Sequence, residues 1–556
     1  MSGPLDGAIA ARLDRWTAER VAERLWDRDG SLWAESGHAP ADVAAWLGWL
    51  DLPDAMARRV GEIRNLAAGV ARDGYRRAAV LGMGGSSLAP ELCARLFEGT
   101  TTLRVCDSTH PDAVRGFRSW ATAARTLLCV SSKSGATSET LAFHASLADV
   151  APALDFVAIT DPDTPLAELA RAQEFRAIVE GEPSVGGRFS ALSVFGMVPA
   201  ALRGADIEGL LDEAQAMAAA CRQPAADNPG LRLGAVIGEA ALAGRDKLTL
   251  LTTPRLVSLG DWVEQLVAES TGKAGRGVVP VVGEPVAAAE QYGTDRCFVL
   301  LSLAGEPESD EMRELAGELR AAGHPVHELT LSRREAVGGE FVRWEVATAA
   351  LGIVLGVDPF DQPDVAEAKA ATEALLAAYR RDGAFRSPMP IVAEPGLAAS
   401  ADPAALGDAP LSVAAAVRSL LETLAEGDYF AILAYLPPDP AVTAALERLR
   451  VSVRDALGAA TTAGIGPRYL HSTGQLHKGG PDTGVYLMLT ADPQRDLPIP
   501  GRVETFGTLL AAQAAGDLAA LQRRGRRALR LHAADAEDGL ARVSHLVAEA
   551  LGSPVA

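Results

Sequence analysis

The sequence predicts an α/β fold: two doubly wound, mostly parallel sheets with flanking helices, followed by a C-terminal α/β portion. From about residue 71 onward, short apolar runs alternate with segments of helical spacing, which is typical of parallel sheets covered by helices. Of the 556 residues, 48% are hydrophobic but only 5% are aromatic, and this balance favours helices packed on sheets over an all-β sandwich. The length leaves room for two or three packed units.

The patterns divide the chain into five segments. Residues 1–70 are predicted to be helical because apolar residues recur there at helical spacing. Residues 71–225 are expected to carry the first sheet, on strands within RRAAVLGM, LRVCD, RTLLCVSS and DFVAIT. Residues 226–380 are expected to carry the second sheet, on strands within KLTLLTT, CFVLLSL and PVHELTL. A linker rich in proline, glycine and alanine is expected over 381–412, and 413–556 form the C-terminal portion, with strands within YFAILAYL, PRYLH, VYLMLT and ALRLHA.

The charge and the hydropathy pattern restrict the partners. The formal net charge of −20 repels nucleic acid and anionic membrane surfaces. A phosphate site in such a protein must be built locally from backbone N–H groups and a few cations. No apolar run reaches about 18 residues, and the apolar stretch 341–357 carries Arg343 and Glu345 near its start, which favours a buried core helix. We therefore expect neither nucleic acid nor a membrane as a partner.

The cysteines and the N-terminal residues indicate a cytoplasmic protein. The first residues lack a basic segment that leads into an apolar one, so no secretory signal is expected. The cysteines form no CxxC pair and are odd in number, which fits reduced thiols; they are Cys93, Cys106, Cys129, Cys221 and Cys297. No group of side chains has the spacing of metal ligands, and the absence of a GxSxG motif disfavours an α/β hydrolase.

A glycine-rich turn follows the first predicted strand. Residues 82–87 (GMGGSS) join that strand to a helix, so that the backbone can approach a ligand closely and the helix N-terminus favours an anion. The turn lacks the third glycine of the dinucleotide-binding fingerprint and the lysine of a P-loop. Alone, it is equally well explained as a tight strand–helix connection.

A second turn is rich in hydroxyl groups. Residues 131–138 (SSKSGATS) contain five hydroxyl side chains and one lysine before a helix begins, and such an array of donors suits a phosphate group. A plain N-cap with a polar turn is the alternative, but it needs only one or two of these hydroxyls. Because this turn follows the strand of the next βα unit, both turns are expected at the carboxyl edge of one sheet, where ligands of open α/β folds bind.

Four further segments carry side chains of catalytic type. Arg188 follows two glycines in GGRFS, where a cation could meet a phosphate or a developing oxyanion, although a surface arginine is the alternative. Glu269 ends the apolar-patterned helix of WVEQLVAESTGK; the helix dipole there favours proton uptake, although a solvated glutamate is the default interpretation. Lys369 ends the helix of VDPFDQPDVAEAK, and His471 and His477 lie in the glycine-rich segment RYLHSTGQLHKGGP.

Together these segments resemble the glucose-6-phosphate isomerase family, which is built from paired sugar-isomerase (SIS) domains. The matching motifs are GMGGSSLAPE, SSKSGATSET, GGRFS, AESTGK and DPFDQPDVAEAK. Each motif is weak alone, but the five occur in family order. The whole chain looks closest to the isomerase half of bifunctional transaldolase/phosphoglucose isomerases. The resemblance implies two SIS-type sheets for the predicted fold and an aldose–ketose isomerisation of glucose 6-phosphate and fructose 6-phosphate in glycolysis and gluconeogenesis.

The resemblance also implies a role for each matching residue. Glu269 would carry the proton between C2 and C1 through a cis-enediol, Arg188 would stabilise the enediolate, and Lys369 would assist ring opening. The substrate would be held by the remaining matches, which are Gly85 and Ser86 for the sugar, Ser132, Lys133, Ser134 and Thr137 for the phosphate, and Gln265 and Gln362 for orientation. The chemistry requires neither a cofactor nor a metal.

The histidine departs from the family order. In ordinary members it lies between the glutamate and the lysine along the chain, whereas the best match here is His471, after Lys369. We expect that the C-terminal portion has taken over the strand that supplies this histidine. The alternative is that another group opens the ring, with His477 as the next candidate.

Two other functions share these motifs. A non-catalytic sugar-phosphate-binding regulator could use the SIS scaffold without turnover, but it would not need Glu269, Lys369 and His471 together. A dual phosphoglucose/phosphomannose isomerase would use the same residues, because one enediol leads to both epimers. The expected partner is a small-molecule sugar phosphate; a homodimer and a transaldolase on a separate chain are further candidates.

Overall fold

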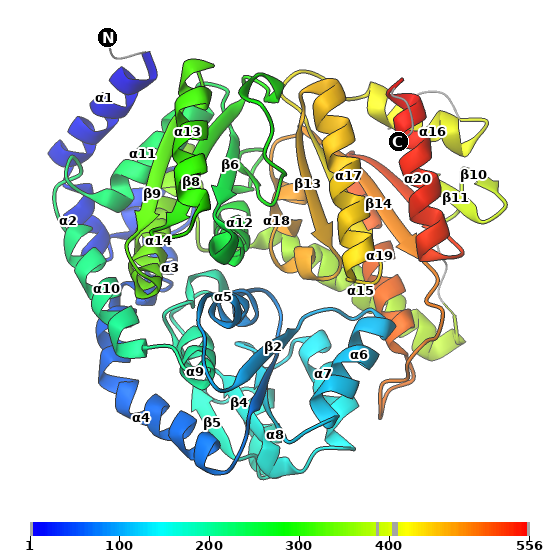
Figure 1. The fold of residues 1–556 in the computed structure, drawn as a ribbon, viewed down its shortest axis with the longest axis horizontal. Helices are drawn as coiled ribbons and strands as arrows, with labels where there is room; N and C mark the ends of the chain where they lie inside the picture. Colours follow the sequence, from blue (N-terminus) through cyan, green and yellow to red (C-terminus); the bar gives the residue numbers. More distant parts are fainter. Residues whose placement is uncertain (1–3, 385–387, 403–409, 553–556) are drawn as a thin grey trace.

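The computed structural model describes residues 4–384, 388–402 and 410–552 of the chain. Three β-sheets organise these residues, and Figure 1 shows the second sheet (green) and the third sheet (orange) beside each other, above the first sheet (blue to cyan). The N-terminal segment expected to be helical is helical, and its helices are α1 (Pro4–Ala18), α2 (Val21–Trp26), α3 (Pro40–Ala44) and α4 (Leu52–Arg72).

The first sheet has the strand order β2-β1-β3-β4-β5, with all neighbours parallel. Its strands are β1 (Arg77–Leu81), β2 (Thr102–Cys106), β3 (Thr126–Ser131), β4 (Phe156–Thr160) and β5 (Ala177–Glu180). The accompanying helices are α5 (Leu88–Leu96), α6 (Pro111–Thr122), α7 (Ser138–Ala148), α8 (Pro165–Ala172), α9 (Val194–Arg203) and α10 (Ile207–Ala220). Strands β3 and β4 are buried along their whole length, which is why their sequences are continuous apolar runs.

The second sheet has the order β7-β6-β8-β9 and is also parallel throughout. Its elements are α11 (Pro229–Leu242), β6 (Lys247–Thr252), α12 (Val257–Thr271), β7 (Val279–Val281), β8 (Arg296–Leu303), α13 (Glu308–Ala321), β9 (Val326–Leu331), α14 (Val337–Leu355) and α15 (Pro363–Asp382). The apolar stretch that sequence alone could confuse with a membrane segment is α14, which packs against α10, α11 and α12. In the described part of the chain, no helix is long and apolar enough to cross a membrane.

The third sheet has the order β10-β11-β15-β14-β12-β13, parallel except for β10 and β11. Its elements are β10 (Val392–Glu394), β11 (Leu397–Ala401), α16 (Val413–Glu422), β12 (Tyr429–Tyr435), α17 (Pro440–Leu457), β13 (Ala460–Ile465), α18 (Gly474–Gly479), β14 (Gly484–Ala491), α19 (Phe506–Arg523), β15 (Arg527–Ala533) and α20 (Ala536–Ala550). The predicted class, two parallel α/β sheets plus a C-terminal α/β portion, is confirmed. The exact boundaries between the five segments stay a prediction.

Two local predictions are wrong. The stretch 381–412 was expected to be a linker or an irregular surface loop. In its described part, which leaves out 385–387 and 403–409, β10 and β11 instead form an antiparallel hairpin that extends the third sheet along β15. The sequence PRYLH was expected to be a strand, but Arg468–His471 form a 3₁₀ turn, and the strand precedes it as β13. Proline at position 467 has no N–H to donate to a neighbouring strand, and β13 ends at Ile465, before this residue.

The N-terminal helices belong to the same core as the first two sheets. Trp16, Trp33 and Trp49 are almost completely buried, and the indole of Trp33 donates a hydrogen bond to the carbonyl of Ala349 in α14 (2.9 Å). The five cysteines are free and buried, as expected for reduced thiols. Burial raises the pKa of Cys93 and Cys129 to about 12, so these thiols are suited to packing and not to nucleophilic chemistry.

Candidate active site

Glu269 lies in the last turn of α12, at the junction of the three sheets. Its side chain is buried, with 6% of its surface exposed. Gln265, one turn earlier on the same helix, donates one hydrogen bond to Glu269 Oε2 (3.0 Å) and another to the carbonyl of His471 (2.8 Å). The i, i+4 spacing that puts both side chains on one helix face therefore also ties the glutamate to the C-terminal portion.

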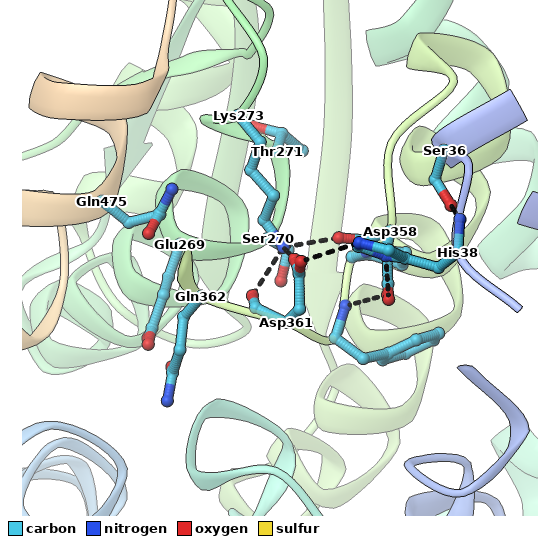
Figure 2. Close-up of polar contacts among 12 residues, drawn as sticks. Ser36, His38, Glu269, Ser270, Thr271, Lys273, Asp358, Asp361, Gln362 and Gln475 are labelled. Carbon is cyan, nitrogen blue, oxygen red and sulfur yellow. Dashed lines mark hydrogen bonds and ion pairs between the residues drawn. The ribbon is translucent and has the colours of Figure 1, made fainter. Parts of the chain in front are cut away.

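Arg188 holds the other side of this carboxylate. The guanidinium is 2% exposed, and its Nη1 lies 3.3 Å from Glu269 Oε1 and 3.1 Å from Gln362 Oε1. Its other nitrogens donate to Ser270 Oγ (2.7 Å) and to the carbonyl of Pro359 (2.6 Å). Figure 2 shows Glu269 and Gln362 pointing in the same direction. The planar guanidinium, with its several N–H donors, can contact all these acceptors at once. These contacts fix the FDQP loop beside Glu269.

The glycine-rich turn packs directly onto these groups. A Cβ atom on Gly85 would lie 1.9 Å from the carbonyl oxygen of Gly187, so only glycine fits at the contact between the GGS and GGRFS segments. The next residue, Ser86, is also buried. Across the turn, a Cβ on Gly84 would come within 3.0 Å of the Gln265 amide and 3.1 Å of His471. The two segments, more than a hundred residues apart in the sequence, therefore form one wall of the site.

His471 comes from the C-terminal portion, at the end of the 3₁₀ turn Arg468–His471. Its Nε2 lies 3.0 Å from Oε1 of Glu139, the second residue of α7, and Gln513 of α19 donates to the same oxygen (2.8 Å). Burial acts to raise the pKa of Glu139, but the charges of His471 and Lys369 lower it below its ordinary value. The structure thus pairs this histidine with a carboxylate that orients it.

The hydroxyl-rich turn lies between β3 and the N-terminus of α7. Ser132 Oγ and Thr137 Oγ1 form a hydrogen bond (2.8 Å), and Ser134 Oγ accepts from the backbone N–H of Ala136 (3.3 Å). Gly135 adopts a φ of +65°, a left-handed conformation that glycine adopts without strain. These hydroxyls thus lie together at the N-terminus of α7, and their role as a phosphate cradle stays a prediction.

The lysine of this turn is engaged elsewhere. The Lys133 ammonium forms an ion pair with Asp161 and donates to the carbonyl of Pro183 (3.3 Å). Asp161 follows the end of β4, so the parallel sheet brings it to the same edge as Lys133. A cation that sequence reasoning missed is Arg502, which donates to Ser138 Oγ (3.1 Å) at the start of α7. No motif surrounds Arg502, and only the fold brings it there.

Lys369 and Gln362 belong to the FDQP segment and α15. Both side chains are exposed; Gln362 accepts from Arg188, and the Lys369 charge reaches Glu139. The fallback histidine, His477, is buried between Tyr469 and Tyr486, and burial holds its pKa well below the ordinary value. It is packed in the core away from the groups above, whereas His471 lies among them.

Three side chains in the described part of the chain could together hold a metal ion: His38, Asp358 and Asp361. The Lys273 ammonium already lies among them, donating to both aspartate carbonyls and to the Asp361 carboxylate (Figure 2). Burial, with the neighbouring Arg188 charge, lowers the pKa of Lys273 to about 8. The Lys273 ammonium, a cation of the protein itself, thus lies within this group of side chains. The expectation that the protein binds no metal stays a prediction.

The fold defines a class: an α/β protein with two parallel sheets and a third, C-terminal mixed sheet, with the candidate residues gathered where their segments meet. No family model matches the chain. It is 31% identical over 341 residues to a probable glucose-6-phosphate isomerase from Haloarcula marismortui, covering 53% of this chain and 77% of the relative. It is 30% identical over 398 residues to the glucose-6-phosphate isomerase of Carboxydothermus hydrogenoformans, covering 59% and 85%. The chain belongs to the glucose-6-phosphate isomerase family.

Solved structures agree with the fold. A hypothetical protein from Thermus thermophilus superposes with a TM-score of 0.56 at 26% identity, covering 66% of this chain and 98% of that protein. A glucose-6-phosphate isomerase from Chlamydia trachomatis superposes with a TM-score of 0.53 at 16% identity, covering 66% and 86%, which supports the fold alone.

Proposed function

We propose that this chain interconverts glucose 6-phosphate and fructose 6-phosphate by proton transfer through a cis-enediol, as a step of glycolysis and gluconeogenesis. The observation that carries the proposal is the setting of Glu269. A buried carboxylate has Arg188 at one oxygen and Gln265 at the other, in a member of the glucose-6-phosphate isomerase family. That arrangement orients a base beside a fixed positive charge, which is what enolisation next to a carbonyl needs.

In the isomerisation step, Glu269 takes the proton from the carbon next to the carbonyl and returns it to the neighbouring carbon. Negative charge then develops on the sugar oxygens of the enediolate. Arg188 is held by Ser270 and by the FDQP loop, so its charge is in place before the reaction and needs no reorganisation. Gln265 and Gln362 orient the base and the substrate.

In the ring-opening step, His471 acts as the acid–base group, and Lys369 assists it and holds the sugar hydroxyls. The carboxylate of Glu139 accepts from His471 Nε2, which fixes the ring orientation of the imidazole. The charge of Lys369 acts on the same carboxylate. The C-terminal portion thereby supplies, within one chain, the histidine that is out of family order.

The phosphate binds at the hydroxyl-rich turn, where Ser132, Ser134 and Thr137 surround the N-terminus of α7. Gly85 and Ser86 contact the sugar. Binding energy gained at the phosphate, which is remote from the reacting carbons, orients the substrate toward Glu269. Because Lys133 is paired with Asp161, its part in the cradle is to hold the turn in shape as well as to supply charge.

The partner of this site is a small sugar phosphate, and the location is the cytoplasm. A homodimer and a transaldolase on a separate chain are further candidate partners.

A coupled assay tests the proposed function. The full chain is supplied with fructose 6-phosphate, and glucose 6-phosphate formation is followed for the wild type, for Glu269→Gln, and for Glu318→Gln as an exposed control on α13. We expect activity in the wild type and the control, and a loss of about a thousandfold or more in Glu269→Gln. A wild type inactive on both hexose phosphates would contradict the proposal, and an active Glu269→Gln would favour another base.

A further inference from the structure

The residue that begins the histidine-bearing turn is itself the centre of a partly buried charge cluster. Arg468 stands three residues before His471 in the 3₁₀ turn Arg468–His471. Its Nη1 lies 2.8 Å from Glu91 Oε2, its Nε lies 3.5 Å from Asp107 Oδ2, and its Nη2 lies 3.5 Å from Asp261 Oδ2. One guanidinium thus uses three nitrogens on three carboxylates.

These carboxylates belong to different parts of the fold. Glu91 is in α5 and Asp107 directly follows β2, both in the first sheet's segment, whereas Asp261 is in α12 of the second. Arg468 brings the third segment to both of them. A planar fork can meet three acceptors at once, which a lysine ammonium on a flexible stem does less well.

Hydrogen bonds also hold the turn. The His471 carbonyl accepts from Gln265 (2.8 Å), and Ser472 Oγ donates to Glu264 Oε1 (3.3 Å). The Tyr469 hydroxyl donates to Asp517 (2.6 Å) inside the C-terminal portion. Of these contacts, Arg468 alone ties the turn by ion pairs to the segments of both the first and the second sheet.

The charges in the cluster keep the guanidinium ionised. Burial acts to lower the pKa of Arg468, but the surrounding carboxylates outweigh it and raise that pKa above its ordinary value. Burial raises the pKa of Asp107 and of Asp261. Burial and the neighbouring Asp261 charge together raise the pKa of Glu264 to about 7. The remaining groups that face the cluster are Glu91, Arg95 and Arg450.

We propose that Arg468 is a positioning residue for His471: it clamps the histidine-bearing turn onto Glu91, Asp107 and Asp261, and so holds the imidazole where ring opening requires it. The inference rests on the proposed function, because it concerns the histidine of that same site. Arg468 itself touches none of the reacting atoms; it acts through the backbone between positions 468 and 471.

A double-mutant cycle tests the proposal on the full chain. The variants are Arg468→Lys, His471→Ala and their combination, with Arg95→Met as the matched control, because Arg95 also binds Glu91 (3.0 Å) but lies on α5. We expect Arg468→Lys to lower kcat by about 10- to 100-fold, with KM changed by less than about threefold, since a displacement of about 1 Å can cost that much. In the His471→Ala background the same change should lower kcat less than about twofold. The control should keep wild-type kcat.

Two results would overturn the proposal: Arg468→Lys with normal kcat, or losses that multiply in the double variant. Arg468→Met is a stronger test of the charge, but it leaves several carboxylates buried without their cation, and Arg468→Lys carries the test if that variant does not fold. Folding of each variant is checked by the midpoint of denaturant unfolding.

A second readout separates this inference from the proposed function. The imidazole signal of His471, assigned in NMR spectra by its loss in His471→Ala, is compared at one pH in the wild type, in Arg468→Lys and in Arg95→Met. We expect its chemical shift to change in Arg468→Lys alone, because the imidazole is displaced relative to Glu139. If the wild type isomerises neither hexose phosphate but the signal moves, the proposed function is wrong while the positioning role of Arg468 is supported. If the signal does not move, the positioning role of Arg468 is wrong.

Discussion

The two halves of the candidate site are built in different ways. The glutamate half consists of Glu269, Gln265 and Arg188, which meet through short contacts of buried side chains from the segments of the first two sheets. The histidine half pairs His471 with Glu139, 332 positions apart, and Gln513 reaches the same carboxylate across 374 positions. The first half thus joins the first and second sheets, whereas the second half joins the first sheet to the C-terminal portion.

This difference indicates that the two acid–base roles depend on different structural contacts. A base that works against an arginine needs both fixed within a rigid core, which the glutamate half provides. A ring-opening histidine needs a carboxylate to orient it, and any segment that reaches Glu139 can supply it. Variants of the two halves should therefore differ in which step they slow.

The largest effect is expected in the glutamate half. Arg188→Lys keeps a positive charge but loses the fork that joins Glu269 to the FDQP loop. Because the charge would no longer be fixed against the developing enediolate, kcat should fall by about 100- to 1,000-fold. Initial rates with fructose 6-phosphate measure this, and Arg64→Lys on the exposed face of α4 is the control. A kcat within about threefold of the wild type would show that Arg188 does not stabilise the enediolate.

A smaller loss is expected in the histidine half. His471→Ala should lower kcat by about 100-fold and Glu139→Gln by about tenfold, because the second change keeps the imidazole but weakens its orientation. The loss should be concentrated in ring opening. An acyclic four-carbon aldose 4-phosphate cannot close the ring, so its C2 proton exchange in D₂O, followed by NMR, should stay within about threefold of the wild type. Equal losses in both reactions would show that the two halves do not act in separate steps.

A still smaller effect is expected at the phosphate end. Arg502 donates to Ser138 beside the hydroxyl-rich turn, so Arg502→Met should raise KM about three- to tenfold and leave kcat within about twofold, as for a lost binding contact remote from the reacting carbons. Arg495→Met, at an exposed position in the same loop, is the control. An unchanged KM would show that Arg502 supports structure alone.

The smallest prediction compares two buried carboxyl groups. Glu139 has partners, whereas Glu345 in α14 is 1% exposed and its Oε1 accepts no hydrogen bond, and burial raises its pKa well above the ordinary value. The folded state therefore holds a proton that the unfolded chain releases above about pH 4.5. Its stability falls as pH rises from there to the folded pKa, by about 1.4 kcal/mol per pH unit. Glu345→Gln should be more stable than the wild type at pH 8 and similar at pH 4; denaturant unfolding at both values checks this, and equal pH dependence would contradict it.

Much of the fold could be predicted because apolar runs and helical spacing in a sequence indicate directly which residues are buried. The buried strands β3, β4, β8 and β12 are continuous apolar runs and were expected. The hairpin of β10 and β11 was missed because its alanine-rich sequence has little strand propensity and is held by pairing with β15. The PRYLH error has a different origin: a segment of five residues is too short to show a period that separates a strand from a turn.

The candidate site shows the same division. Glu269, Arg188 and Gln265 lie in motifs that resemble the glucose-6-phosphate isomerase family, and their joint assignment to one site came from that resemblance; helix spacing alone places only Gln265 beside Glu269. The Lys133–Asp161 pair, Gln513 and Arg502 depend on which strand ends share an edge, and sequence spacing contains no such information. Arg468 was passed over because a surface arginine and a buried clamp look alike in a sequence.

The most direct test of the central claim is isomerisation of fructose 6-phosphate in D₂O, with the product analysed for deuterium at C2. The account predicts that the wild type yields glucose 6-phosphate carrying deuterium at C2, because the proton on Glu269 exchanges with solvent in part of the turnovers, and that Glu269→Gln loses turnover and exchange together. Glu269→Gln that keeps wild-type turnover and deuterium incorporation would contradict it.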